Sequence, residues 1–173
     1  MKLALLSDAH GRSHRLEAVL EDLEAEGADQ VISLGDVGAG HCLTLLRELD
    51  ATAVFGNYEV SGWRRIDPEH TSWVQSWQPI VEGERFIAAH AVPWRPPGLQ
   101  TLADFGDWLR DTGSSWRSLF PYMTEDERFI WRTLAILEEA DKSIFFHGHT
   151  HVQTAWRWEP DGRLREVRNT TFK

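Results

Sequence analysis

The feature that most constrains the fold is a regular alternation of short apolar runs with helical patterns in the first 57 residues. Three apolar runs stop at polar residues, which is the pattern of buried strands: residues 2–7 (KLALLS), 29–36 (DQVISLGD) and 51–57 (ATAVFGN). After the first run, apolar residues recur at helical spacing, at Leu16, Val19, Leu20 and Leu23. Residues 42–50 (CLTLLRELD) repeat the helical pattern. This alternation favours a parallel sheet covered by helices on both faces.

Helix boundaries are predicted from capping residues. Ser13 is a candidate N-cap for the first helix, and Gly27 is a candidate C-terminal stop. Thr124 begins a T-E-D-E sequence with the spacing of a capping box. A helix containing residues 131–140 (WRTLAILEEA) is therefore expected to begin at Thr124.

The second half of the chain is less regular. Residues 79–90 (PIVEGERFIAAH) and 154–169 (TAWRWEPDGRLREVRN) each predict a hairpin, and residues 143–146 (SIFF) predict a fourth core strand. Residues 91–123 contain too much proline and glycine for one continuous element. Two tryptophans, Trp73 and Trp77, precede this stretch, and two more, Trp94 and Trp108, lie in it. We expect the four to pack in the core or in contacts between copies of the chain rather than to stack on a nucleobase.

Length and composition predict one soluble domain spanning residues 1–173. The net charge of −9 argues against non-specific binding to nucleic acid, which needs a basic face. A single cysteine, Cys42, excludes an internal disulfide and fits a reducing compartment. No segment is apolar enough to span a membrane, and Asp8 comes too early for a signal peptide. We therefore expect a cytoplasmic protein without membrane partners.

Side chains that can bind a metal follow the predicted strands. They are Asp8 and His10 after the first strand, Asp36 after the second, Asn57 after the third, His90 after the hairpin, and His149 and His151 after SIFF. Each alone is more often a turn former, a cap or a structural histidine. In an open α/β sheet, however, ligands bind in the crevice at the carboxyl ends of the strands. The seven together predict one polar site at that edge.

Five short motifs resemble those of the calcineurin-like metallophosphoesterases, in the same order. They are SDAHG, LGD, FGNYE, AAH and HGHTH, and the resemblance spans Leu3 to Val152. The resemblance implies an α/β fold, a two-sheet β-sandwich flanked by helices in four layers (α/β/β/α). It also implies two metal ions at one edge of the sandwich.

The resemblance assigns the ligands to two metals. One metal would take Asp8, His10, Asp36 and His151, and the other would take Asp36, Asn57, His90 and His149, so that Asp36 bridges them. Mixed oxygen and imidazole ligands suit transition metals better than Mg²⁺. Manganese is favoured, with iron, zinc and nickel as alternatives. His147 has no place in the pattern and is assigned to the end of its strand.

The implied activity is hydrolysis of a phosphoester by metal-activated water. Asp36, Asn57, Tyr58 and His90 would then be catalytic. Tyr58 departs from the family, whose phosphatases carry a histidine there that is thought to protonate the leaving group. An ordinary tyrosine, with a pKa near ~10, is a poorer acid at neutral pH than a histidine near ~6.5. Family members without that histidine include bacterial enzymes that act more readily on phosphodiesters than on monoesters, so the resemblance favours a phosphodiesterase.

Several alternatives stay open. Tyr58 could bind the substrate, by its hydroxyl or by stacking. It could instead pack beside the site while His14 or His41 donates the proton. The chain could instead be a phosphomonoesterase, a protein or dinucleoside-polyphosphate phosphatase, or a non-catalytic scaffold. Arg64 and Arg65 could bind a substrate phosphate, or could be a solvated loop pair. The expected partner is a small phosphoester or nucleotide, and a homo-oligomer is possible.

Overall fold

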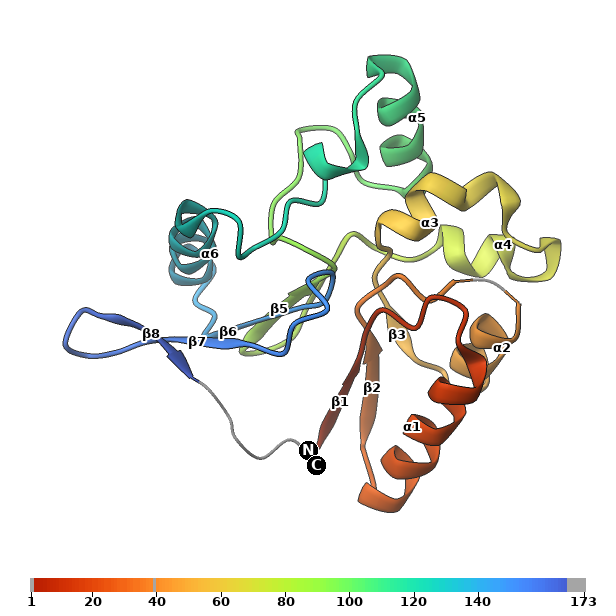
Figure 1. Ribbon diagram of the computed structural model, residues 1–173, viewed down its shortest axis with the longest axis horizontal. Coiled ribbons are helices and arrows are strands. Elements are labelled where there is room, and N and C mark those ends of the chain that lie inside the picture. The colour runs from red at the N-terminus through yellow and green to blue at the C-terminus, as the bar shows by residue number, and fades with distance from the viewer. Residues whose placement is uncertain (1, 39, 168–173) are drawn as a thin grey trace.

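The computed structural model describes residues 2–38 and 40–167 of the 173-residue chain. Helices and strands alternate along it (Figure 1). The first half contains β1 (Leu3–Leu6), α1 (Ser13–Glu26), β2 (Gln30–Ser33), α2 (His41–Glu48), β3 (Thr52–Ala53), α3 (Asn57–Gly62), η1 (Trp63–Arg65) and α4 (Pro68–Gln75). The second half contains β4 (Ile80–Glu82), β5 (Phe86–Ala89), α5 (Leu102–Thr112), η2 (Trp116–Ser118), α6 (Glu127–Glu139), β6 (Ile144–His147), β7 (Ala155–Trp158) and β8 (Leu164–Val167).

The described strands form three sheets. In the first, β1, β2 and β3 are parallel and lie in that order, with Leu5 opposite Ile32. In the second, β5 pairs antiparallel with β4 and parallel with β6, so that Ala89 lies opposite His147. The third is the antiparallel hairpin of β7 and β8. The carboxyl ends of β1, β2, β3, β5 and β6 all lead into predicted ligands, which is the arrangement that concentrates polar groups at one edge.

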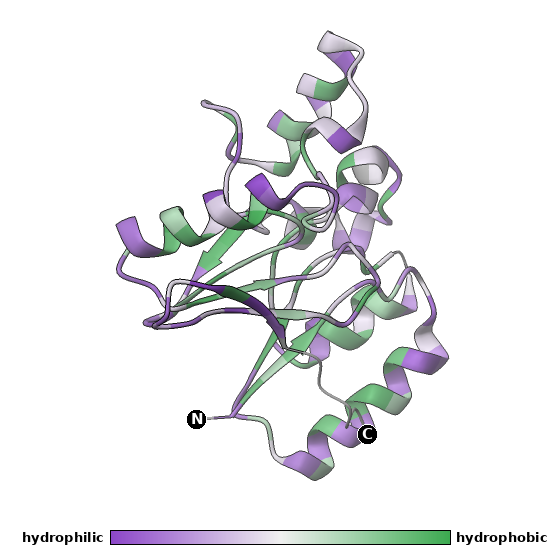
Figure 2. Ribbon diagram, turned by 60° about the vertical axis from the view of Figure 1, so that its left-hand side comes forward, coloured by the Kyte–Doolittle hydropathy of each residue, from purple (hydrophilic) through white to green (hydrophobic). Residues whose placement is uncertain are grey.

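Apolar side chains pack between the two three-stranded sheets and on their outer sides. One cluster combines Ile32 of β2 and Leu5 of β1 with Ala88 of β5 and Phe146 of β6. A larger cluster joins the first sheet to α1, α2 and α5, and a third joins α6 to the second sheet. The strands of both sheets are mostly hydrophobic, whereas the helices alternate hydrophobic and hydrophilic residues (Figure 2). These contacts support two sheets with helices outside them, and the four-layer order stays a prediction.

Most expected elements are confirmed, including both hairpins and the fourth core strand. Residues 168 and 169, at the end of the second expected hairpin, lie outside the described residues. Gly27 ends α1 in the left-handed conformation as expected. Trp77 is buried, and Trp73 packs edge-on against it, which confirms a core role for both. Cys42 is a buried free thiol.

Two predicted helix starts are wrong. Arg12, not Ser13, is the N-cap of α1, and it makes no side-chain capping bond. Helix α6 begins at Glu127, where the Asp126 carboxylate accepts a hydrogen bond from the backbone N–H of Arg128. Asp126 is therefore the cap in place of Thr124. Its carboxylate also binds the Arg128 side chain, and this second contact has no counterpart in the capping-box pattern.

Helices α3 and α4 were not predicted. They follow β3 directly, where the sequence gives only the ligand motif and two arginines before Pro68. Proline at the first turn of α4 is favourable because its missing N–H would be unpaired there. Among the described residues, no helix is long and apolar enough to cross a bilayer.

Candidate metal centre

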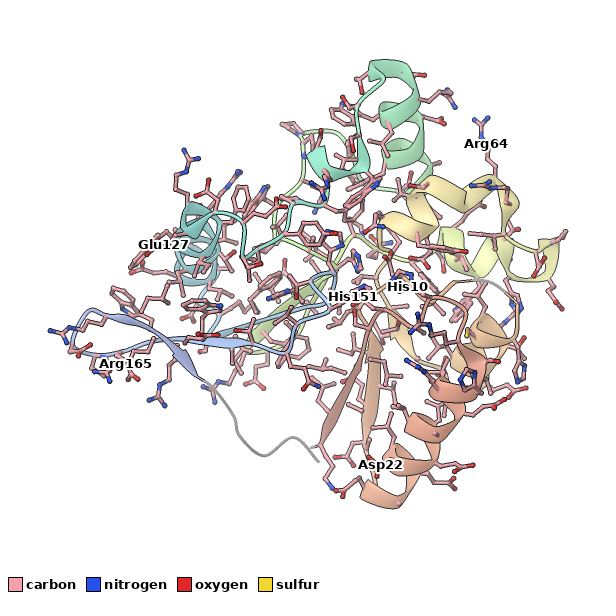
Figure 3. All side chains as sticks on the ribbon, in the orientation of Figure 1. His10, Asp22, Arg64, Glu127, His151 and Arg165 are labelled. Carbon is pink, nitrogen blue, oxygen red and sulfur yellow. The ribbon has the colours of Figure 1, made fainter. Side chains whose placement is uncertain are left out.

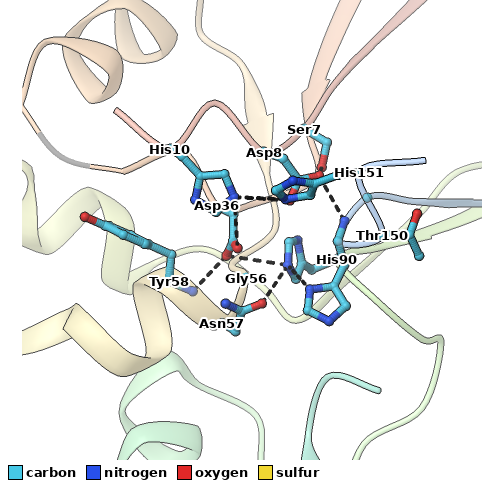
Figure 4. Close-up of polar contacts among 12 residues, drawn as sticks. Ser7, Asp8, His10, Asp36, Gly56, Asn57, Tyr58, His90, Thr150 and His151 are labelled. Carbon is cyan, nitrogen blue, oxygen red and sulfur yellow. Dashed lines mark hydrogen bonds and ion pairs between the residues drawn. The ribbon is translucent and has the colours of Figure 1, made fainter. Parts of the chain in front are cut away.

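The structure brings the seven predicted ligands together from segments that are up to 143 residues apart in sequence, from position 8 to position 151. Figure 3 shows His10 and His151 side by side where the loops after β1 and β6 meet. Among the described residues, two clusters have ligand atoms close enough to hold a metal ion: Asp8, His10 and His151, and Asp36, His90 and His149. The Asn57 side chain adjoins the second cluster (Figure 4).

The first cluster is half-exposed. The Nε2 atoms of His10 and His151 lie 3.1 Å apart. Asp8 Oδ1 lies 3.7 Å from His10 Nε2 and 3.3 Å from His151 Nε2. Its other oxygen, Oδ2, accepts hydrogen bonds from the Ser7 hydroxyl and the His149 backbone N–H. One oxygen of Asp8 is thus fixed by the protein, and the other faces both histidines.

The second cluster is buried. His90 Nε2 lies 3.1 Å from His149 Nδ1, 3.2 Å from Asn57 Oδ1 and 3.5 Å from Asp36 Oδ1. The other oxygen of Asp36, Oδ2, lies 3.7 Å from His10 Nε2 in the first cluster. Asp36 therefore presents one oxygen to each cluster, as a bridging ligand would.

Two backbone carbonyls determine which histidine nitrogens face the second cluster. Leu34 O lies 2.7 Å from His90 Nδ1, and Phe120 O lies 2.9 Å from His149 Nε2. Each carbonyl accepts the N–H of a neutral imidazole, so the opposite ring nitrogens, His90 Nε2 and His149 Nδ1, present lone pairs to each other. Metal-binding histidines are commonly oriented by such carbonyl contacts.

The spacing of these acceptors fits a shared cation. Two ligands about 2.1 Å from one ion lie roughly 3.0 Å apart at a right angle and 3.4 Å apart at the tetrahedral angle. The observed contacts of 3.1–3.7 Å are close to those values. Asp8 Oδ1 is also buried without a hydrogen-bond partner among the described residues. A buried carboxylate oxygen facing two imidazoles is costly unless a cation or proton lies there, and the donor set therefore fits a pair of divalent metals.

The backbone is strained at the same positions. Among the described non-glycine residues, seven have a positive φ. Asp50 and Asp141 directly follow the C-caps of α2 and α6, where a left-handed residue is common. The other five are all predicted ligands: Asp8 (58°), His10 (48°), Asp36 (53°), His149 (69°) and His151 (54°). Such conformations cluster at functional sites, where they aim side chains that regular structure would point elsewhere.

The carboxylate of Glu59 holds the loops around Asp36 in place. It is buried and accepts hydrogen bonds from the backbone N–H groups of Asp36 and Gly56 at 2.9 and 2.8 Å, and from Val37 at 2.9 Å. Burial and the nearby Asp36 charge raise the pKa of Glu59. Gly56 must be glycine because a Cβ there would overlap Asp36 Oδ1.

Charge and burial set the protonation of the centre. Burial, reinforced by the charge of His90, lowers the pKa of His149 to about 4, so its ring is neutral and able to bind a metal near neutral pH. Burial acts against the charged form of Asp36, but the hydrogen bond with His90 holds the pKa of Asp36 below its ordinary value. That same contact raises the pKa of His90 although burial opposes it.

The remaining predicted residues lie at or beyond the edge of the centre. Tyr58 is exposed, its backbone N–H donates to Asp36 Oδ1 at 2.7 Å, and its ring lies edge-on to that of His10 at 5.9 Å. Arg64 and Arg65 lie in η1, outside both clusters. His147 ends β6 and stacks on Phe145, and its pKa is lowered by burial.

Sequence reasoning missed an aromatic wall beside His149. Tyr122 stacks on the His149 ring at 4.4 Å, and Trp116 lies edge-on to it at 5.5 Å. Arg117 lies over both aromatic rings, 5.4 Å from Tyr122 and 5.6 Å from Trp116. All three belong to the connection between α5 and α6, which has no strand or helix pattern strong enough to place it. The concentration of aromatic residues at 116–122 was the one available signal.

Comparison with known proteins agrees with this geometry. The model of the calcineurin-like phosphoesterase superfamily domain matches residues 1–167. An uncharacterized protein of Methanocaldococcus jannaschii, MJ0912, is 26% identical over 87% of this chain and 62% of its own length. The crystal structure of a metallophosphoesterase from Sphaerobacter thermophilus superimposes with a TM-score of 0.64 at 23% identity, over 94% of this chain and 65% of that one. The chain thus spans somewhat less than two thirds of each relative. Because the family model covers nearly all of it, the chain belongs to the calcineurin-like phosphoesterase superfamily.

Proposed function

We propose that this chain is a two-metal phosphoester hydrolase that prefers phosphodiesters. The observation that carries the proposal is the pair of ligand clusters that share Asp36, with lone pairs of His90 and His149 facing each other at 3.1 Å. Two divalent cations held there would supply the positive charge that polarises phosphoryl oxygens and lowers the pKa of water. The imidazole and carboxylate donors favour manganese, with iron, zinc and nickel as alternatives.

The residues of the chain give the site its polarity. Two carboxylates, Asp8 and Asp36, oppose two dications, so the loaded centre would be positive in a protein whose net charge is −9. The partly exposed His10 and the exposed His151 leave the first cluster open to solvent, and the buried His90 and His149 close the second. An anionic phosphoester would therefore approach from the side of His10 and His151.

Tyr58 supports the preference for diesters. The residue is 48% exposed and its ring lies beside His10, so it can contact a bound substrate on the open side. A tyrosine hydroxyl can orient a substrate oxygen but is a weaker proton donor than imidazolium at neutral pH. His41, one alternative donor, is paired with Glu17 at 2.9 Å and lies outside both ligand clusters.

Hydrolysis of two chromogenic esters tests the proposal. The Mn²⁺-loaded protein should hydrolyse bis(p-nitrophenyl) phosphate with a higher kcat/KM than p-nitrophenyl phosphate. Asp36→Asn should reduce both rates by at least about 100-fold, because it weakens the shared ligand. Asp161→Asn, which alters an exposed carboxylate of the β7–β8 hairpin, is the matched control and should change neither. If the loaded wild-type protein turns over neither ester, the enzymatic proposal fails.

Restoring the family's histidine tests the role of Tyr58. Tyr58→His should raise the ratio of monoester to diester turnover by about tenfold, since imidazolium can protonate a poor leaving group. Tyr58→Phe separates this effect from simple loss of the hydroxyl. The measurement should use phenyl phosphate, whose leaving group needs a proton more than p-nitrophenolate does. An unchanged ratio in Tyr58→His would contradict the proposed reason for the diester preference.

A further inference from the structure

We propose that an open cavity beside the metal centre binds a second phosphate group of the substrate, with Arg65 as its principal contact. The substrate would then be a phosphodiester that carries another phosphate, such as a nucleoside with phosphates on two hydroxyls. This inference rests on the proposed phosphodiesterase activity. It adds a binding site in a part of the molecule that holds none of the predicted metal ligands.

The cavity lies between η1 with the end of α3 and the facing helix α5. Its volume is about 460 Å³, within the range of pockets that hold small organic ligands. Polar and cationic side chains line it from both sides: Ser61, Arg64, Arg65, Arg110, Ser114 and Ser115. Guanidinium groups and hydroxyls suit an anion, and Val60, Leu109 and Trp116 add apolar surface beside them.

The pairing of the three arginines singles out Arg65. Asp107 Oδ1 accepts hydrogen bonds from Arg64 at 3.3 Å and from Arg110 at 2.7 Å. Asp111 accepts a further bond from Arg110 at 3.0 Å. These carboxylates hold two guanidinium groups at the cavity wall and largely neutralise them. Arg65 has no ion pair or hydrogen bond with any residue that the structure describes, so its donors are available to a ligand.

Trp116 connects the cavity to the metal centre. It lines the cavity and also lies edge-on to His149, with 5.5 Å between ring centroids. Helix α3 provides a second connection because it begins at the ligand Asn57 and reaches the cavity at Ser61. Four residues of helix correspond to about 6 Å. Figure 3 shows the Arg64 side chain above α3, away from His10 and His151. The cavity is therefore a separate site within reach of one substrate.

The spacing decides which substrates could use both sites. A phosphate bound by Arg65 could not also be the group that is hydrolysed, because Arg65 belongs to neither ligand cluster. A substrate that reaches both sites needs a spacer between two phosphates, as a ribose or deoxyribose ring provides. A simple diester with one phosphate would leave the cavity empty. The two kinds of substrate should therefore differ in KM.

Two matched esters test this difference. They are the p-nitrophenyl esters of thymidine 5′-phosphate with and without an additional 3′-phosphate, so the reacting group is the same in both. With Mn²⁺-loaded protein, the 3′-phosphate should lower KM about tenfold and leave kcat unchanged. Arg65→Gln should abolish this advantage, and Arg65→Lys should restore part of it, since a lysine keeps the charge without the guanidinium fork. Arg165→Gln, on the distant hairpin, should behave like the wild type.

Binding to the metal-free protein gives a readout that does not depend on turnover. After treatment with EDTA, calorimetry should show tighter binding of thymidine 3′,5′-bisphosphate than of thymidine 5′-phosphate, and Arg65→Gln should remove the difference. Equal binding of the two nucleotides to the wild type, or an unchanged preference in Arg65→Gln, overturns the proposal. Failure to hydrolyse either ester would instead count against the proposed activity. The binding measurement would still test the phosphate site in the cavity.

Discussion

At the scale of single residues, the geometry of the metal centre requires a strained backbone at most of its ligands. Five of the seven predicted ligands have a left-handed backbone, which costs an L-residue roughly 1–2 kcal/mol. His10 is one of these strained residues. Its ring contacts His151, and its backbone N–H donates to Asp36 O at 2.9 Å. The strain remains when the metal is absent, so the ligand positions should be weak points of the metal-free protein.

Glycine and alanine at position 10 should test this strain directly. In the metal-free protein, His10→Gly should be about 1 kcal/mol more stable to urea than His10→Ala, because glycine adopts a positive φ without a Cβ clash. The matched pair is Glu21→Gly and Glu21→Ala within α1, where the order should reverse because alanine is the better helix former. Greater stability of the alanine variant at both positions would rule out strain at His10.

At the scale of elements, regular patterns were predictable and irregular connections were not. The strands that lead to Asp8, Asp36 and His149 are apolar runs followed by polar residues, a pattern that can be recognised in the sequence. The sequence could therefore place the seven candidate ligands at one edge of a sheet. Tyr122 and Trp116 gave no such signal. They reach His149 through a connection whose path depends on tertiary packing, and no local periodicity encodes that path.

The start of α6 shows how a local pattern can mislead. The sequence around Thr124 has the spacing of a capping box, yet the helix begins three residues later with Asp126 as its cap. The Asp126 carboxylate accepts hydrogen bonds from both the backbone and the side chain of Arg128, and its charge makes these bonds stronger than those to a neutral hydroxyl. These two contacts of Asp126 explain why the helix begins at Glu127 although Thr124 has the capping-box spacing.

Paired alanine substitutions should distinguish the two caps. Asp126→Ala should lower the free energy of unfolding by about 1 kcal/mol, the usual cost of losing an N-cap. Thr124→Ala should change it by less than about 0.5 kcal/mol, as for an exposed residue without a structural bond. Chemical denaturation of both variants in the same buffer gives the comparison. A larger loss at Thr124 would mean that the helix extends further towards the N-terminus in solution.

At the scale of the whole molecule, the metal centre is the place where distant parts of the chain meet. Its ligands come from loops after strands of both three-stranded sheets, and Asp8 Oδ2 accepts the backbone N–H of His149, 141 residues further on. The Cβ that Gly148 lacks would overlap Ser7, which shows how closely the two loops approach. Binding of metal should consequently stabilise the association of the two sheets and not only the loops.

Thermal unfolding should reveal this coupling. Metal that binds the folded chain at 100 times its dissociation constant adds about 2.7 kcal/mol of stability. For a domain of this size that amount corresponds to an increase in Tm of roughly 5–10 °C over the EDTA-treated protein. Mg²⁺ should give a smaller increase than Mn²⁺, because imidazole ligands suit it poorly.

The contribution of the shared ligand can be isolated by comparing each variant with and without metal. Asp36→Asn should lose most of the Mn²⁺-dependent increase in Tm, whereas Asp161→Asn on the hairpin should retain it. Comparing differences within a variant removes any effect of the substitution on the metal-free fold. Equal melting temperatures of the wild type in EDTA and in Mn²⁺ would mean that the clustered acceptors do not hold a metal, since any ligand that binds only the folded state must raise Tm.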